Sequence, residues 1–86
     1  MDLATLSMRI CDEMGVSPEA LREGGRTELV SRARAVLSYV WTQHLGRSGR
    51  TLAQELGVSP QAVYAASKRV GEEIHLDQDD LQRWCR

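Results

Sequence analysis

The stretch that decides the fold is Thr51-Leu-Ala-Gln-Glu-Leu-Gly-Val-Ser-Pro-Gln-Ala-Val-Tyr-Ala-Ala-Ser-Lys-Arg-Val70. It predicts a short helix, a tight turn and a second helix, because Gly57 suits a left-handed helix end and Ser59 before Pro60 is a typical helix start. Small and apolar residues recur at helical spacing on both sides of the turn: Leu52, Ala53, Leu56, Val63, Ala66, Ser67 and Val70. The pattern predicts a helix-turn-helix motif over about residues 50–70, with an ordinary helical hairpin as the alternative.

The rest of the chain carries further helical patterns and no strand pattern of useful length. We expect helices at about residues 2–14, 17–23, 27–45, 50–56, 60–75 and 78–85. The longest, 27–45, is predicted to be the central helix, with His44 on its apolar face as a packed core histidine. Leu81 and Trp84 are the expected packing residues of the last helix. The sequence therefore predicts an all-α fold of five to six helices, in a single domain covering residues 1–86.

Composition excludes several classes of protein. No run approaches 18 apolar residues, so no membrane helix is expected, and no signal peptide is visible. Cys11 and Cys85 are predicted to be free thiols in a reducing cytosol, with a disulfide between them as the alternative. His44 and His75 have no partners at metal-ligand spacing, and no catalytic motif is present. We therefore expect a cytoplasmic protein that is not an enzyme and has no cofactor, metal or small-molecule substrate.

Charge is distributed unevenly, although the formal net charge is only −1. Residues 1–25 carry two basic and five acidic side chains, and residues 71–86 carry the same numbers. Residues 26–70, which include the predicted helix-turn-helix, carry seven basic and two acidic side chains. A basic segment of this kind favours contact with phosphate, and a solvated arginine-rich surface is the alternative.

The order of these features resembles a known family. It comprises a first helix, Gly15-Val16-Ser17-Pro18 with a short helix, a joint at Gly25-Arg26, a long helix bearing Arg32-Ala33-Arg34, and a helix-turn-helix. Over roughly residues 3–75 this is similar to the C-terminal DNA-binding domain of the bacterial replication initiator DnaA, which has a Trp-repressor-like helix-turn-helix. It is also similar to the DnaA-like tails of REP-associated transposases and to small stand-alone DnaA-like proteins.

The resemblance implies a grip on both grooves of double-stranded DNA. Arg26 stands where the family places an arginine in the minor groove, and Arg32 and Arg34 match basic positions at the start of the long helix that touch phosphate. Thr27, which can cap that helix, is a further expected phosphate contact. The initiator has an Arg-Asp-His-Thr-Thr run where this chain has Val58-Ser-Pro-Gln-Ala62, so its base-reading residues are not carried over. That departure favours the DnaA-like tail group over a true initiator. The implied context is bacterial and nucleoid-associated, in replication initiation or its regulation, or as the tail of a transposase-like protein.

The chemistry of the side chains supplies candidate contacts independently of the resemblance. Outward positions at the start of the second helix are the expected major-groove contacts, namely Ser59, Gln61, Tyr64 and Ala65. Gln61 can pair with adenine through two hydrogen bonds. The expected phosphate contacts of this motif are Arg50, Thr51, Lys68 and Arg69. Each assignment has an alternative. Ser59 could simply cap the helix, Tyr64 could pack at the edge of the core, and Lys68 and Arg69 could be solvated surface. The role of Arg47 is ambiguous.

A protein-interaction module of the same fold, with little affinity for DNA, is the rival interpretation. The acidic ends and the low net charge fit it, and an exposed apolar patch around Leu81 and Trp84 would favour it. The partner would then be another protein or the rest of a longer chain. Steep salt dependence of binding distinguishes DNA from an apolar interface.

Overall fold

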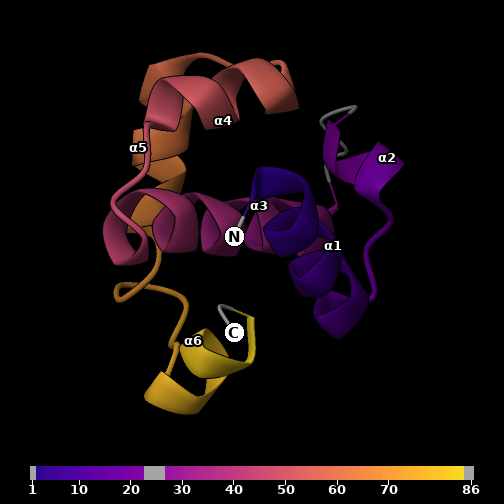
Figure 1. Ribbon diagram of the computed structural model, residues 1–86, viewed down its shortest axis with the longest axis vertical. Helices are drawn as coiled ribbons and strands as arrows, with labels where there is room; N and C mark the ends of the chain where they lie inside the picture. Colours follow the sequence, from indigo (N-terminus) through magenta and orange to yellow (C-terminus); the bar gives the residue numbers. More distant parts are fainter. Residues whose placement is uncertain (1, 23–26, 85–86) are drawn as a thin grey trace.

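Helix α3 is the element on which the other helices pack in the computed structural model, which describes residues 2–22 and 27–84. The described elements are α1 (Leu3–Met14), α2 (Pro18–Arg22), α3 (Glu28–Tyr39), the π-helical turn η1 (Val40–His44), α4 (Gly49–Leu56), α5 (Pro60–Lys68) and α6 (Gln78–Trp84). Figure 1 shows α4 and α5 at one end of the molecule and α6 at the other. The predicted all-α bundle is confirmed for this part of the chain.

Each helix begins where a short polar side chain can accept a backbone N–H from its first turn. Asp2 accepts from Thr5 at 2.8 Å, Thr27 accepts from Val30 at 3.2 Å, and Ser59 accepts from Ala62 at 3.2 Å. The hydrogen bonds from Thr5 also hold the pKa of the Asp2 carboxyl below its ordinary value. The start signals expected from the sequence therefore position α1, α3 and α5.

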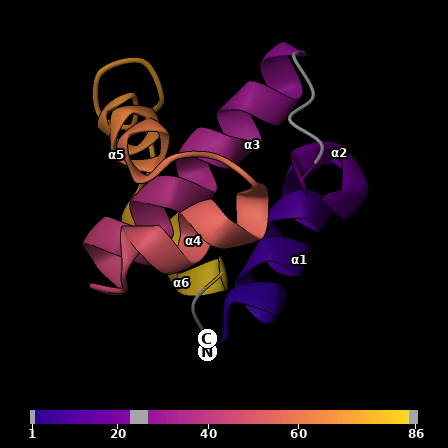
Figure 2. The same ribbon diagram turned by 90° about the horizontal axis from the view of Figure 1, so that it is seen from above.

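The core lies along α3, which is flanked by α1 and α5 (Figure 2). Fully buried side chains from these three helices and from η1 meet here, and they are mostly aliphatic: Leu6, Ile10, Ala33, Val36, Leu37, Val40 and Val63. Cys11 is buried with them as a free thiol, and burial raises its pKa. Cys85, its possible disulfide partner, lies outside the described residues.

The long helix predicted over 27–45 is interrupted. The α-helical part ends at Tyr39, and η1 follows, in which the Leu45 N–H donates to the Val40 carbonyl at 2.9 Å. A π-helical turn contains more residues than an α-helical one, so it rotates later side chains away from the face that a 3.6-residue period predicts. The prediction that His44 is a core residue is wrong for this reason, because the structure leaves it exposed.

The second helix of the predicted pair is shorter than the expected 60–75. Helix α5 ends at Lys68, and the Arg69 carbonyl accepts the N–H groups of Glu73 at 2.7 Å and Ile74 at 3.1 Å to close a tight turn. Gly71 has a φ of 97° within this turn, which is a conformation that L side chains rarely adopt. The late glycine therefore turns the chain away from the helix axis and towards α6.

Candidate nucleic-acid interface

The turn between α4 and α5 has the local geometry expected from the sequence. Gly57 has a left-handed φ of 69°, and the Val58 N–H donates to the Ala53 carbonyl at 3.0 Å. Ser59 then caps α5 and Pro60 occupies its first turn. Because Ala53 is buried and small, the two helices can pack closely at the turn. The turn fixes which face of α5 is directed away from the core.

That outward face of α5 carries the predicted base-contacting residues. Ser59, Gln61, Tyr64 and Ala65 are all exposed, whereas Val63 is buried. The face holds an amide, a phenol ring and small side chains, with no charge until Lys68 in the last turn. It therefore offers hydrogen bonding and apolar contact at its start and a cation at its end.

Tyr64 also contacts the beginning of α4. A Cβ placed on Gly49 would lie 2.8 Å from both the Cζ and the Oη atoms of Tyr64, so the ring lies directly against the glycine. The residue nevertheless remains 46% exposed. The sequence presents packing at the edge of the core and contact with DNA as alternatives for Tyr64. The side chain is packed on one side and exposed on the other. The contact was missed because nothing in the sequence links positions 49 and 64.

Gly49→Ala is expected to destabilise the wild-type protein by about 1 kcal/mol, because the new methyl group overlaps the Tyr64 ring. In a Tyr64→Ala background the same change is expected to stabilise by about 0.5 kcal/mol, because alanine is the better helix former. Urea unfolding of the four proteins checks this change of sign. Equal effects in the two backgrounds would contradict the contact.

The cations in the described ranges differ in whether they form ion pairs. Arg22 pairs with Glu55 at 3.5 Å, and Arg83 pairs with Glu13 at 3.1 Å. By contrast, four exposed cations have no ion pair with any residue in the described ranges: Arg32, Arg47, Arg50 and Lys68. Glu55 is the one acidic residue between positions 29 and 71, so the sequence supplies few intramolecular partners there.

Arg69, a predicted phosphate contact, is bound within the molecule. It donates to the Ser31 hydroxyl at 2.7 Å and to Glu73 at 3.0 Å, and its guanidinium lies 3.6 Å from Glu28. Its side chain is only 28% exposed. The geometry makes Arg69 a link between the end of α5 and the start of α3.

The remaining predicted contacts in the described ranges lie on α4, on α3 and at the N-cap of α3. Thr51 is exposed on α4, and Thr27 is exposed with its hydroxyl engaged in capping α3. Arg32 is exposed, whereas Arg34 is half-buried. Arg26, the predicted minor-groove residue, lies outside the described residues.

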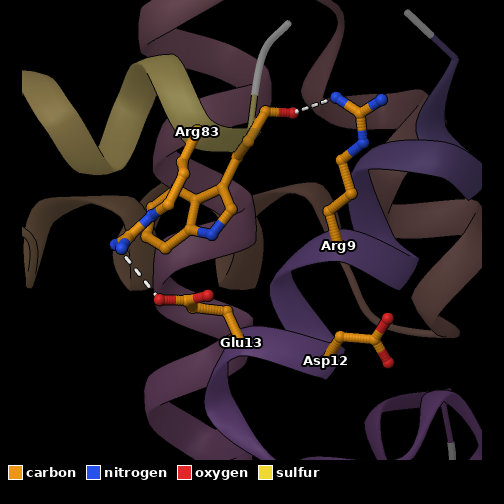
Figure 3. A pocket seen from close by; sticks show the side chains of 5 residues that line it. Arg9, Asp12, Glu13 and Arg83 are labelled. Atoms are coloured by element: carbon orange, nitrogen blue, oxygen red, sulfur yellow. Dashed lines mark hydrogen bonds and ion pairs between the residues drawn. The ribbon is translucent and has the colours of Figure 1, made fainter.

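A separate shallow pocket lies between α1 and α6, far from α4 in the fold (Figures 1 and 3). Arg9 donates to the Trp84 carbonyl at 3.1 Å, and Arg83 reaches Glu13 on α1 and Asp80 on its own helix. These contacts use the charged groups to hold α6 on α1. The residues that line this pocket therefore join α6 to α1 within the molecule, and Leu81 of α6 is buried as predicted.

Comparisons with protein-family models, with curated proteins and with solved structures found no match to this chain. Within residues 2–22 and 27–84, no helix has the length and apolarity needed to cross a membrane. Over the same ranges, no three His, Cys, Asp or Glu side chains form a group that could hold a metal ion.

Proposed function

We propose that this chain binds double-stranded DNA in a sequence-specific manner, through a helix-turn-helix formed by α4 and α5. The observation that carries the proposal is the pair of cations Arg50 and Lys68, which form no ion pair with any residue in the described ranges and lie on the two helices that meet at the exposed Tyr64. Cations of this kind can neutralise phosphates without first breaking an ion pair.

In this proposal the outward face of α5 enters the major groove. Gln61 pairs with adenine, Tyr64 contacts a thymine methyl group or a phosphate, and Ala65 allows close approach. Ser59 contributes by capping the helix at the point nearest the bases. Arg26 inserts into the minor groove. The phosphate contacts are Thr27, Arg32, Arg34, Arg50, Thr51 and Lys68.

For Arg69, the residue that follows α5, we propose a role other than the phosphate contact that the sequence predicts. Its guanidinium already contacts Ser31, Glu73 and Glu28, and a phosphate would have to compete with these partners. We assign it to holding α5 at a fixed position against α3. The biological setting that the resemblance to DnaA-like domains implies, replication control or a transposase-like tail, belongs to the same proposal.

The rival proposal, a protein-interaction module, would be favoured by an exposed apolar patch on α6. Leu81 is 9% exposed and Trp84 is 5% exposed, so these two side chains form no such patch. The large apolar side chains that are exposed in the described ranges, Met8, Leu29 and Tyr64, lie on three different helices. No observation on the described residues favours this function over DNA binding.

The double variant Arg50→Ala/Lys68→Ala is expected to lower the slope of log affinity against log salt by about two units, because each phosphate contact contributes about 0.9. Fluorescence anisotropy with a randomised duplex over a series of salt concentrations measures this slope. Selection from the same duplex pool then reports the preferred sequence.

The matched control is Arg9→Ala/Arg83→Ala, which removes the same charge from the joint between α1 and α6, away from this surface. Circular dichroism establishes that both double variants are folded. The proposal fails if the wild-type protein shows no salt-dependent affinity for duplex DNA, or if the two double variants lower the slope equally.

A further inference from the structure

The segment between η1 and α4 is held against a buried tryptophan. The indole N–H of Trp41 donates to the Ser48 carbonyl at 2.9 Å, and the Arg47 N–H donates to the Trp41 carbonyl at 2.9 Å. The Arg47 guanidinium carbon lies 5.7 Å from the centre of the Trp41 ring, within the range of a cation–π contact. Trp41 therefore holds both the backbone and the side chain of this segment.

This arrangement orders Arg47 without occupying its hydrogen-bonding edge. The Arg47 guanidinium donates no side-chain hydrogen bond to any residue in the described ranges, so its planar N–H groups remain able to bind a phosphate at two points. Arg47 is exposed, and within residues 2–22 and 27–84 it has no acidic partner. An ordered arginine loses less side-chain entropy on binding than a mobile one does.

The position of Arg47 places it beside the proposed DNA surface. It precedes Ser48, whose hydroxyl accepts the Arg50 N–H at 3.2 Å, and Gly49, against which Tyr64 packs. Arg47 and Arg50 therefore stand on either side of Ser48 and Gly49 at the beginning of α4, and Gly49 is the residue against which Tyr64 packs. A phosphate backbone that runs past the beginning of α4 would meet both arginines.

We infer that Arg47 is an additional phosphate contact for duplex DNA and that Trp41 is its positioning residue. The inference rests on the proposed function, because it assigns two more residues to the same surface. It also explains how a short exposed segment that contains Gly46, with a φ of 66°, can present a cation in a defined place.

Four variants test the inference by anisotropy with the same duplex over a series of salt concentrations. Arg47→Ala is expected to lower the salt slope by about one unit. Arg47→Lys is expected to restore the slope but not the full affinity, because a lysine cannot form the planar two-point contact. Trp41→Phe keeps an aromatic ring but loses the N–H group, so it is expected to weaken binding about threefold with the slope retained. Arg83→Ala, which removes an exposed charge from α6, away from this surface, is expected to leave the slope unchanged.

The indole N–H signals in nuclear magnetic resonance spectra report binding by the wild-type protein itself, without a comparison of variant affinities. The Trp41 N–H signal, assigned by its loss in Trp41→Phe, is expected to shift when duplex is added to the wild-type protein, whereas the Trp84 signal stays in place. If the wild-type protein binds the duplex but Arg47→Ala keeps its slope and affinity, the inference is overturned and the proposed function stands. If the wild-type protein shows no salt-dependent binding, both fail.

Discussion

Leu37→Ala is expected to lower the free energy of unfolding by about 3 kcal/mol, the largest effect of any change considered for this protein. Leu37 has no exposed surface and lies in α3, which packs against α1, α2 and α5. Surrounded on several sides, the site cannot close fully around the smaller side chain, so a cavity adds to the lost transfer energy. For a domain of this size the loss is a large share of total stability.

Urea unfolding followed by circular dichroism measures the effect as a shift of the midpoint with an unchanged slope. The matched control is Leu29→Ala, the same substitution on the same helix at a residue that is 46% exposed. It is expected to cost less than about 0.5 kcal/mol. Similar losses for the two variants would show that α3 does not lie at the centre of the core.

Arg69→Ala is expected to lower the free energy of unfolding by about 1.5 kcal/mol. The change removes the charge-assisted hydrogen bond to Ser31, which joins residues 38 positions apart, together with the ion pairs to Glu73 and Glu28. The exposed ion pairs contribute little, so most of the loss is assigned to the bond with Ser31. Urea unfolding at low and high salt measures the loss and separates the part that salt screens.

A double-mutant cycle isolates the contact. In the Arg69→Ala background, Ser31→Ala is expected to cost almost nothing, whereas in the wild-type background it costs about 1 kcal/mol. Arg69→Lys keeps the charge but cannot reach the three partners at once, so it is expected to restore only part of the loss. Because Arg69 is bound internally, the salt slope of DNA binding should stay as in the wild-type protein. If Arg69→Ala instead lowered the salt slope by one unit, Arg69 would be a phosphate contact.

The parts of the fold that depend on neighbouring residues could be predicted from the sequence. A cap such as Ser59 and a left-handed glycine such as Gly57 act over three or four positions, and both behave as expected. The buried faces of α1 and α4 follow the 3.6-residue period for the same reason. The final packing residues, Leu81 and Trp84, were identified by their spacing alone.

The predictions were wrong where the same local sequence pattern is compatible with two different backbone conformations. The apolar stripe of the long helix continues through Trp41 whether the turn there is α-helical or π-helical, so the periodicity could not reveal that His44 rotates outward. Gly71 weakens a helix without ending it, and the backbone bonds to the Arg69 carbonyl decide that the chain turns there. Neither outcome can be read from residue types alone.

For the candidate surface, the sequence predicts which residues are exposed but not which of its cations already form ion pairs or hydrogen bonds within the molecule. Helical spacing correctly placed Gln61, Tyr64 and Ala65 on the exposed face of α5. Which arginines already have a partner depends on contacts between distant segments, such as Arg22 with Glu55 and Arg69 with Ser31. The count of basic residues in a segment treats every cation alike, so it overstates the number of cations that are available to bind a phosphate.

The joint between α1 and α6 has a consequence for the order in which the chain folds. The bond from Arg9 to the Trp84 carbonyl spans 75 positions, which is most of the chain. Closing so long a loop carries an entropic cost that contacts between successive helices do not. We therefore expect α3 and its near neighbours to assemble first, and α6 to dock late, on a surface of α1 that is already formed. The last helix would then report on completed folding rather than initiate it.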